Sequence, residues 1–214
     1  MKNNDIGRSL MEMMGVIAVI GALTIGALNG FQKGMGKLKV KKVKDQIADI
    51  STSIRTLYMQ HETYEGLNNQ SAVNMQVLPL DMGTGEHLLS PFRGNVTIGT
   101  GKVLEEEPAN SAKAFYLIYD KINRESCIEL ASADWGGKGV SILAVGVFGH
   151  SVDAATIEDV AKGVYYDYEG YDGEYGIATP QGSVLSIPIP LYKAVKLCNC
   201  DNQSLSCTML WKYQ

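Results

Sequence analysis

The most regular feature of the hydrophobic pattern is an apolar run near the start of the chain. Residues 13–32 carry no charged side chain, and about twenty such residues are what a helix needs to cross the hydrocarbon core of a membrane. Glu12 stands directly before the run. Because an ionisable group at the edge of a membrane-length segment is costly in lipid, it is by default a candidate functional residue. The pattern predicts a membrane-length helix over residues 8–32, bordered by one acid of functional importance.

A second helical pattern follows the apolar run. Apolar residues recur at alternating steps of four and three, and they are Val43, Ile47, Ile50, Ile54 and Leu57. This spacing places them on one face of a helix, so it predicts a single helix over residues 9–58 whose second half packs on a sheet. Lysines occupy much of the opposite surface at its start, which leaves a basic amphipathic helix on anionic lipid as an alternative. The apolar stripe extends beyond the lysines into a stretch that contains Asp45 and Asp49. This favours packing on a sheet over binding to anionic lipid.

Small residues are spread along the same predicted helix. Gly26, Gly30 and Gly34 recur every fourth residue and form the kind of small-residue edge that lets helices approach closely in lipid. Each glycine also weakens a helix by about 0.8–1.0 kcal/mol relative to alanine. Since Gly36 follows, we expect a soft helical segment over residues 29–36.

The rest of the chain, residues 61–214, alternates short strand signals with turn signals. We expect strands at residues 95–99, 112–120, 140–148, 183–189 and 206–213, short helices at residues 121–133 and 156–162, and turns at residues 68–71, 81–85 and 90–91. Several strands with a few helices favour an α+β body with a mainly antiparallel sheet. The chain then divides into a long N-terminal helix over residues 8–60 and a globular body over residues 61–214.

Charge is distributed unevenly between these two parts. The net charge of −4 combines eight Lys or Arg and two acids through Lys44 with eleven Lys or Arg and twenty-one acids after it. An acidic body argues against nucleic acid as a partner, because phosphate binding needs clustered basic residues. Six lysines between residues 33 and 44 follow the apolar run closely. The positive-inside rule would place them in the cytoplasm, so the charge pattern alone favours a cytoplasmic body.

No motif of a familiar enzyme class is present in the sequence. It lacks the phosphate-binding, dinucleotide-binding, zinc-protease and nucleophile-elbow patterns. His61, His87 and His150 are scattered along the chain, and each is expected to be a surface or capping residue. We therefore expect no catalytic residue, no cofactor and no metal site.

Four cysteines lie in the second half of the chain, at Cys127, Cys198, Cys200 and Cys207. Four cysteines allow three complete pairings, and the sequence does not choose among them. A zinc site is the alternative, but the Cys-x-x-Cys pair and the nearby histidine of such sites are missing from the sequence. Disulfides are the default if the chain is exported to an oxidising compartment.

One segment near residue 170 is unusually rich in tyrosine and acids. Its tyrosines are Tyr165, Tyr166, Tyr168, Tyr171 and Tyr175, and its acids are Asp167, Glu169, Asp172 and Glu174. The plainest interpretation is a solvated loop with aromatic edges packed on the sheet. Tyrosine is also a frequent interface residue, so a surface that contacts protein or glycan is a second interpretation. A calcium site is a third, although the acids do not follow EF-hand spacing.

The N-terminal residues resemble the class III signal of type IV pilins. Residues 7–12 read Gly-Arg-Ser-Leu-Met-Glu and lead directly into the apolar run. An ordinary signal peptide would instead have a basic start, a shorter apolar core and a cleavage site beyond that core. The resemblance implies a leader at residues 1–7, cleavage after Gly7 by a prepilin peptidase, N-methylation of Arg8 and a role in assembly for Glu12. Pilins usually begin with Phe, Met or Leu, so Arg8 departs from the family pattern.

Shorter stretches of the body resemble the type IVb class of pilins, which includes toxin-coregulated and PilS-like conjugative pilins. They are residues 90–94, 114–127, 194–198 and 208–211. The resemblance implies the pilin fold, an α+β body with the long helix packed on a mainly antiparallel sheet. It also implies a disulfide between Cys127 and Cys198, which would leave Cys200 and Cys207 to close a tight hairpin.

The same resemblance implies a structural filament subunit. Its partners would be other copies of the pilin, the prepilin peptidase, the inner-membrane pilus assembly machinery and the membrane during biogenesis. The precursor would lie in the inner membrane of a Gram-negative bacterium, leader inside and body outside, and the mature chain would join an extracellular pilus for adhesion, conjugation or motility. The alternatives are a type II secretion pseudopilin, a simple membrane anchor with Glu12 in the headgroups, and a membrane-tethered monomeric binding domain.

Overall fold

The computed structural model describes most of the chain. Described are residues 4–83, 87–103, 107–108, 110–135, 142–148, 157–158, 161, 168–169, 175–178, 189–200 and 206–214; for residues 4–10, 29, 168–169 and 175–178 this holds for the backbone alone. The chain forms two compact units, Met1–Lys39 and Val40–Gln214. The boundary falls inside the first helix, so the two halves of this helix belong to different units.

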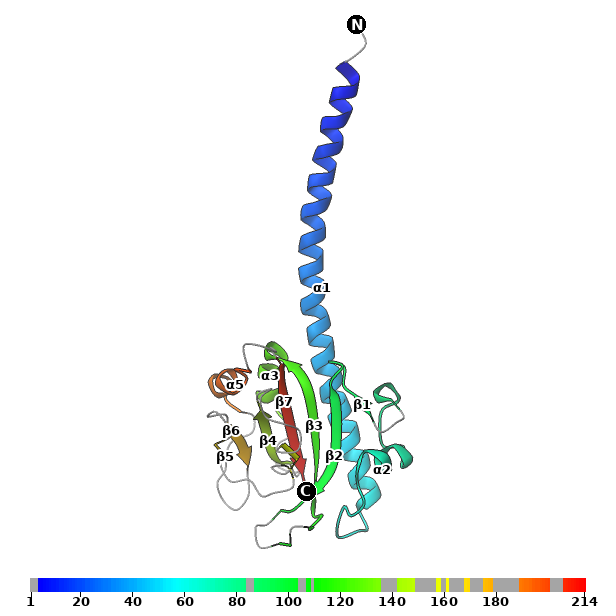
Figure 1. Ribbon diagram of the computed structural model, residues 1–214, viewed down its shortest axis with the longest axis vertical. Coiled ribbons are helices and arrows are strands. Elements are labelled where there is room, and N and C mark those ends of the chain that lie inside the picture. Colours follow the sequence, from blue (N-terminus) through cyan, green and yellow to red (C-terminus); the bar gives the residue numbers. More distant parts are fainter. Residues whose placement is uncertain are drawn as a thin grey trace. The chain divides into compact units, whose positions relative to one another are not determined.

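The long helix predicted from the hydrophobic pattern is present as α1, Asn4–Tyr58 (Figure 1). It ends where the periodicity predicts but begins before the expected start at residue 9. Gly7 does not stop it, because one glycine costs only about 1 kcal/mol and a long helix propagates cooperatively. The helix also continues through residues 29–36, so the softness expected there is not a break and stays a prediction of local stability.

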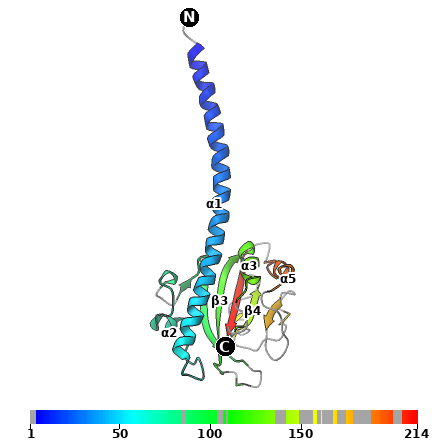
Figure 2. The same ribbon diagram turned by 180° about the vertical axis from the view of Figure 1, so that it is seen from behind.

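Unit 2 is built on an antiparallel sheet (Figure 2). The strands of the described residues are β1 (Leu88–Leu89), β2 (Asn95–Gly101), β3 (Ala114–Asn123), β4 (Ile142–Phe148), β5 (Tyr168–Glu169), β6 (Tyr175–Ala178) and β7 (Ser206–Tyr213). Their order is β1-β2-β3-β7-β4-β6-β5, and every pair is antiparallel. The last strand therefore lies between β3 and β4, where Trp211 pairs with Leu117 and Val145. The predicted α+β architecture with a mainly antiparallel sheet is confirmed.

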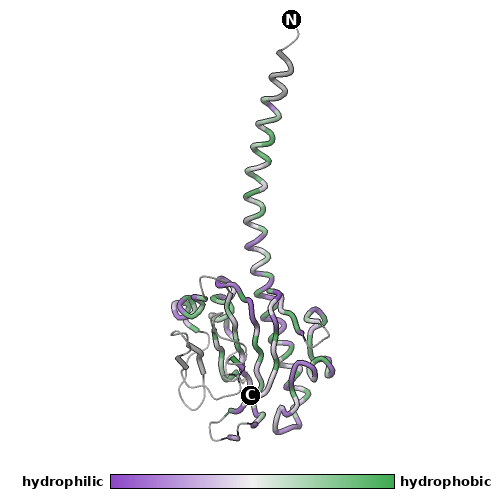
Figure 3. The backbone as a smooth tube through the Cα atoms, viewed as in Figure 1, coloured by the Kyte–Doolittle hydropathy of each residue, from purple (hydrophilic) through white to green (hydrophobic). Residues whose placement is uncertain are grey.

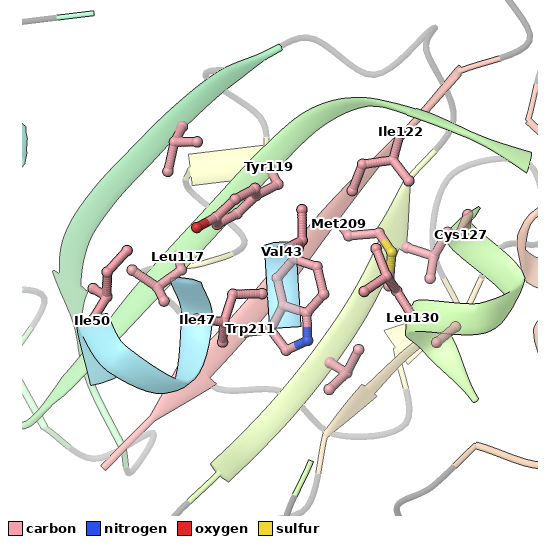
Figure 4. Packing of buried hydrophobic residues seen from close by; sticks show 14 of the residues in the cluster. Val43, Ile47, Ile50, Leu117, Tyr119, Ile122, Cys127, Leu130, Met209 and Trp211 are labelled. Atoms are coloured by element: carbon pink, nitrogen blue, oxygen red, sulfur yellow. The ribbon is translucent and has the colours of Figure 1, made fainter. Parts of the chain in front are cut away.

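The second half of α1 packs on one face of this sheet. The shared core includes Val43, Ile47, Ile50 and Ile54 from the helix and Leu117, Tyr119, Met209 and Trp211 from the strands (Figure 4). The rings of Tyr119 and Trp135 both meet Trp211 edge-on, with centroids 5.7 and 5.1 Å away. The predicted stripe ends one turn early, since Leu57 is half exposed. The helix is thus held to the sheet by the residues that its periodicity marks.

The shorter helices differ most from the expectations. They are α2 (Asn69–Asn74), α3 (Arg124–Ala131) and α5 (Leu191–Leu197), with a 3-10 turn η1 (Leu80–Met82). The turn predicted at residues 68–71 is wrong, because Asn68 and Ser71 form a reciprocal capping box that starts α2. Helix α3 begins three residues later than predicted, since β3 continues to Asn123, whose side chain caps the helix at Ser126 N.

The remaining expectations have mixed outcomes. The strands predicted at residues 95–99, 140–148 and 206–213 are confirmed as β2, β4 and β7. Ile157, Glu158 and Ala161 are helical, as predicted. The strand predicted at residues 183–189 lies outside the described residues except for Ile189, which is not in a strand. Helix α5 follows Pro190 and has no counterpart among the predicted elements.

Candidate assembly site

The first half of α1 presents an apolar surface. Each large apolar side chain from Met11 to Phe31 is more than half exposed, and hydrophobic positions repeat along this part of the helix (Figure 3). Among the described residues, α1 is the one helix long and apolar enough to cross a membrane, judged by length and composition. Soluble monomers rarely expose so large an apolar surface. This segment therefore has the properties of a membrane anchor or of a helix buried among partners.

The candidate processing and assembly residues lie at the start of this segment. Gly7 and Arg8 are within α1, where the structure describes their backbone alone. Glu12 lies at the beginning of the apolar surface, is exposed, and forms no ion pair with a described residue. In lipid or between packed helices, this carboxylate would be strongly destabilising without a partner.

Two lysines tie α1 to the rest of unit 2. Lys42 Nζ lies 2.7 Å from Asp81 Oδ2, and Lys44 Nζ lies 3.8 Å from Glu129 Oε1. Gln46 Nε2 also donates to Asp81 Oδ2 at 2.9 Å. Burial raises the pKa of Asp81, but the hydrogen bond and charge of Lys42 outweigh it, so this pKa lies below its usual value. These contacts join the helix to η1 and α3.

The four cysteines gather near α3, α5 and β7. Disulfides join Cys127 to Cys198 and Cys200 to Cys207, with Cα atoms 5.8 and 5.3 Å apart. The first links α3 to the end of α5, and the second links the segment after α5 to β7. The sulfur atoms of Cys127, Cys200 and Cys207 lie within 4.8 Å of one another. They could hold a metal only after reduction, because the ligand of a soft metal is the thiolate.

The tyrosine-rich segment is partly described. Outside the described residues lie Tyr165, Tyr166, Tyr171, Asp167, Asp172 and Glu174. Tyr168 belongs to β5 and Tyr175 to β6, and these strands pair with Glu169 opposite Tyr175. This part is therefore a strand pair at one edge of the sheet rather than the expected loop. A contact surface on it stays a prediction.

Lys212 is a buried charge that sequence reasoning missed. It lies in β7 between Trp211 and Tyr213, is 1% exposed, and donates from Nζ to Ala161 O at 2.9 Å. Burial lowers its pKa to about 8. Alternation along the strand puts Lys212 on the face opposite Trp211, which in the sequence reads as a solvent-facing position. Its burial could be predicted only if this face of the sheet were known to be covered by another layer. The helix predicted at residues 156–162 is the sequence signal for such a layer.

Known proteins share both sequence and fold with this chain. A family model described as PilS N terminal matches residues 38–164, more than half of the chain. The chain belongs to the PilS family of type IVb pilins. The resemblance to type IVb pilins is thereby confirmed at the level of the family. Cleavage after Gly7, methylation of Arg8 and the assembly role of Glu12 stay predictions.

This pilin is also similar to curated relatives and to a solved structure. Proteins named major structural subunit of bundle-forming pilus, from Escherichia coli O111:H- and from Escherichia coli O127:H6, are each 27% identical over 165 residues, covering 72% of the pilin and 81% of the relative. TcpA, a type IV pilin from Vibrio cholerae El Tor biotype, matches with a TM-score of 0.54 and 14% identity, over 83% of the pilin and 99% of TcpA. That match shows the type IV pilin fold.

Proposed function

We propose that this pilin is the structural subunit of a type IVb pilus and assembles through the first half of α1. The observation that carries the proposal is the exposed apolar surface from Met11 to Phe31, which has Glu12 at its beginning in a chain of the PilS family. Its relatives are named as the major structural subunits of a pilus. In a filament these helices would bundle, stabilised by burial of Val, Ile and Leu and by close packing of small residues.

Cleavage after Gly7 would prepare the chain for assembly. A prepilin peptidase would remove residues 1–7, and methylation of the new amine of Arg8 would follow. Glu12 of one copy would then pair with this amine on a neighbouring copy. A charge left unpaired in the apolar core would cost about 3–5 kcal/mol, so the pair would fix the register between neighbours.

Before assembly, the precursor would lie in the inner membrane of a Gram-negative bacterium. Residues 8–32 would span the bilayer, with the leader inside, the body outside, and the pilus assembly machinery as the partner that extracts the chain. The two disulfides support this orientation, since they persist in oxidising compartments. The positive-inside rule favours the opposite orientation, with the lysines after the apolar run in the cytoplasm. Its weight is reduced here because Lys42 and Lys44 are paired with carboxylates of unit 2.

The role of the mature chain would be structural. It would act by polymerising with other copies outside the cell, and it would need no cofactor, metal or catalytic residue. Charge complementarity between acidic bodies and the basic part of α1 would add to the contacts between copies.

Replacement of Glu12 by alanine tests the assembly role. We expect Glu12→Ala to be exported and cleaved after Gly7 but to yield few or no filaments, because the amine of Arg8 would be left unpaired in the core. Immunoblots of sheared and membrane fractions measure assembly, and the electrophoretic shift measures cleavage. Glu62→Ala, which removes an exposed acid of unit 2, is the matched control and should assemble normally. Normal filaments from Glu12→Ala would contradict the role of Glu12.

A further inference from the structure

Lys33 and Lys37 differ from Lys42 and Lys44, the later lysines of α1 that form ion pairs. Both are exposed, and neither forms an ion pair with a described residue. The sequence also offers them no local partner, because no acid occurs between Glu12 and Asp45. Lys42 and Lys44, further along the helix, pair with Asp81 and Glu129, whereas no such pair is formed by these two lysines with a described residue.

The position of the two lysines along the axis of α1 places them at a membrane surface. Residues 13–32 extend about 30 Å at 1.5 Å per residue, which matches the hydrocarbon core of a bilayer. Lys33 is then the first residue beyond the core, and Lys37 lies about 6 Å further out. The headgroup layer is about 5–8 Å thick on each side, so both lysines fall within it. Since they are four residues apart, they share one face of the helix.

We propose that Lys33 and Lys37 bind the phosphates of anionic phospholipid headgroups while the precursor is in the membrane. The lipid supplies the negative charge that the surrounding sequence lacks, and the long stems of lysine let the amines reach the headgroups. Anionic headgroups attract basic residues close to a bilayer surface. The proposal rests on the proposed function, because it needs the membrane-inserted precursor. It also gives a reason for basic residues on the outer side, where the positive-inside rule does not expect them.

Other anionic partners fit the position less well. Nucleic acid or the acidic body of a second copy could attract lysines anywhere on an exposed helix, but neither explains charges placed directly at the end of a membrane-length apolar run. The placement therefore favours lipid for Lys33 and Lys37 in particular.

Lipid selectivity in nanodiscs tests this proposal on the full chain. One copy per disc is placed in equal parts of phosphatidylcholine and phosphatidylglycerol, and electron spin resonance of trace spin-labelled lipids gives the relative association of each with the protein. We expect the unmodified chain to favour phosphatidylglycerol by about fivefold and to lose this preference at high salt. K33Q/K37Q should bring the ratio close to one. K121Q/K193Q, which removes two charges from unit 2, is the matched control and should keep the preference.

Several results would overturn the proposal. One is equal association of the two lipids with the unmodified chain, and another is an equal loss in K33Q/K37Q and in K121Q/K193Q. A third is an unchanged lipid preference in K33Q/K37Q together with the loss of another property. Lost binding to a labelled DNA duplex would assign the lysines to nucleic acid, and lost filaments would assign them to a second copy. The proposed function fails separately, if the unmodified chain does not stay inserted in discs of phosphatidylcholine alone.

Discussion

Lys212 carries a charge next to a buried apolar cluster of unit 2. Its neighbours across the sheet are Tyr116 on β3 and Ala144 on β4, and both belong to a buried cluster. The hydrogen bond from Nζ to Ala161 O satisfies one of the amine's three donors. A buried amine is easier to accommodate when neutral, so this single residue makes the stability of unit 2 sensitive to pH.

The burial of Lys212 predicts the direction of that sensitivity. In the folded chain its pKa is lowered from 10.5 to about 8, mainly by burial. Between these values the unfolded chain binds more protons, so this contribution to the unfolding free energy grows as the pH rises above 8 and is lost as the pH falls through 8. Lys212→Met should remove it. Between pH 7 and pH 10, the unfolding free energy of the unmodified chain should therefore rise by roughly 2 kcal/mol relative to that of Lys212→Met.

Denaturant unfolding in mild detergent at several pH values between 7 and 10 measures this shift. Tryptophan fluorescence is a suitable signal, because Trp211 and Trp135 are in contact near the core. Lys121→Met changes an exposed lysine and should leave the pH profile as it is. Parallel profiles for the unmodified chain and Lys212→Met would show that the buried amine does not govern the dependence.

Other residues show why local sequence predicts some positions and not others. Glu12 is conspicuous in the sequence because its charge conflicts with the apolar residues that follow it, and its role in assembly stays a prediction. Asn69 could not, since its partners are distant: Oδ1 accepts from Ile98 N at 2.7 Å and Nδ2 donates to Val96 O at 3.0 Å. Both partners lie on β2, so these bonds, which hold α2 against the sheet, leave no signal around residue 69.

At the level of elements, periodicity is informative where one face of an element is buried. The stripe from Val43 to Ile54 predicts the packed half of α1, and alternation or apolar runs predict β2, β4 and β7. The insertion of β7 between β3 and β4 could not be predicted, because strand order depends on contacts far apart in the chain. Helix α5 was missed since Leu191, Tyr192 and Val195 are exposed, which blurs its apolar face.

The two disulfides join elements over very different distances and should contribute unequally. Cys127 and Cys198 are 71 residues apart, whereas Cys200 and Cys207 are 7 apart. In the chain-entropy description the longer loop is worth about 4 kcal/mol and the shorter about 2 kcal/mol. We therefore expect C127A/C198A to lower the unfolding free energy by roughly 2 kcal/mol more than C200A/C207A.

Equilibrium denaturation of the two double variants measures this difference, and a free-thiol assay confirms that the remaining pair stays oxidised in each. Replacing whole pairs avoids leaving a single reactive thiol near the other bridge. A loss for C200A/C207A that equals or exceeds the loss for C127A/C198A would contradict the loop-length explanation.

The whole molecule combines two units with different requirements. Unit 2, Val40–Gln214, has a continuous core that includes residues from α1, β3 and β7, so it can keep its fold in different surroundings. Unit 1, Met1–Lys39, exposes its large apolar side chains from Met11 to Leu38 and needs lipid or other copies to cover them. A membrane precursor and a filament subunit are two successive ways to meet that need with one segment.

The intact mass and N-terminal sequence of the protein sheared from cell surfaces test this most directly. We expect a chain that begins at Arg8, carries a methylated amine and is recovered in the sheared fraction, because cleavage after Gly7 and assembly through α1 would then both have occurred. A chain that still begins at Met1 and is found only in membranes would contradict the filament role and leave a membrane-tethered domain in its place.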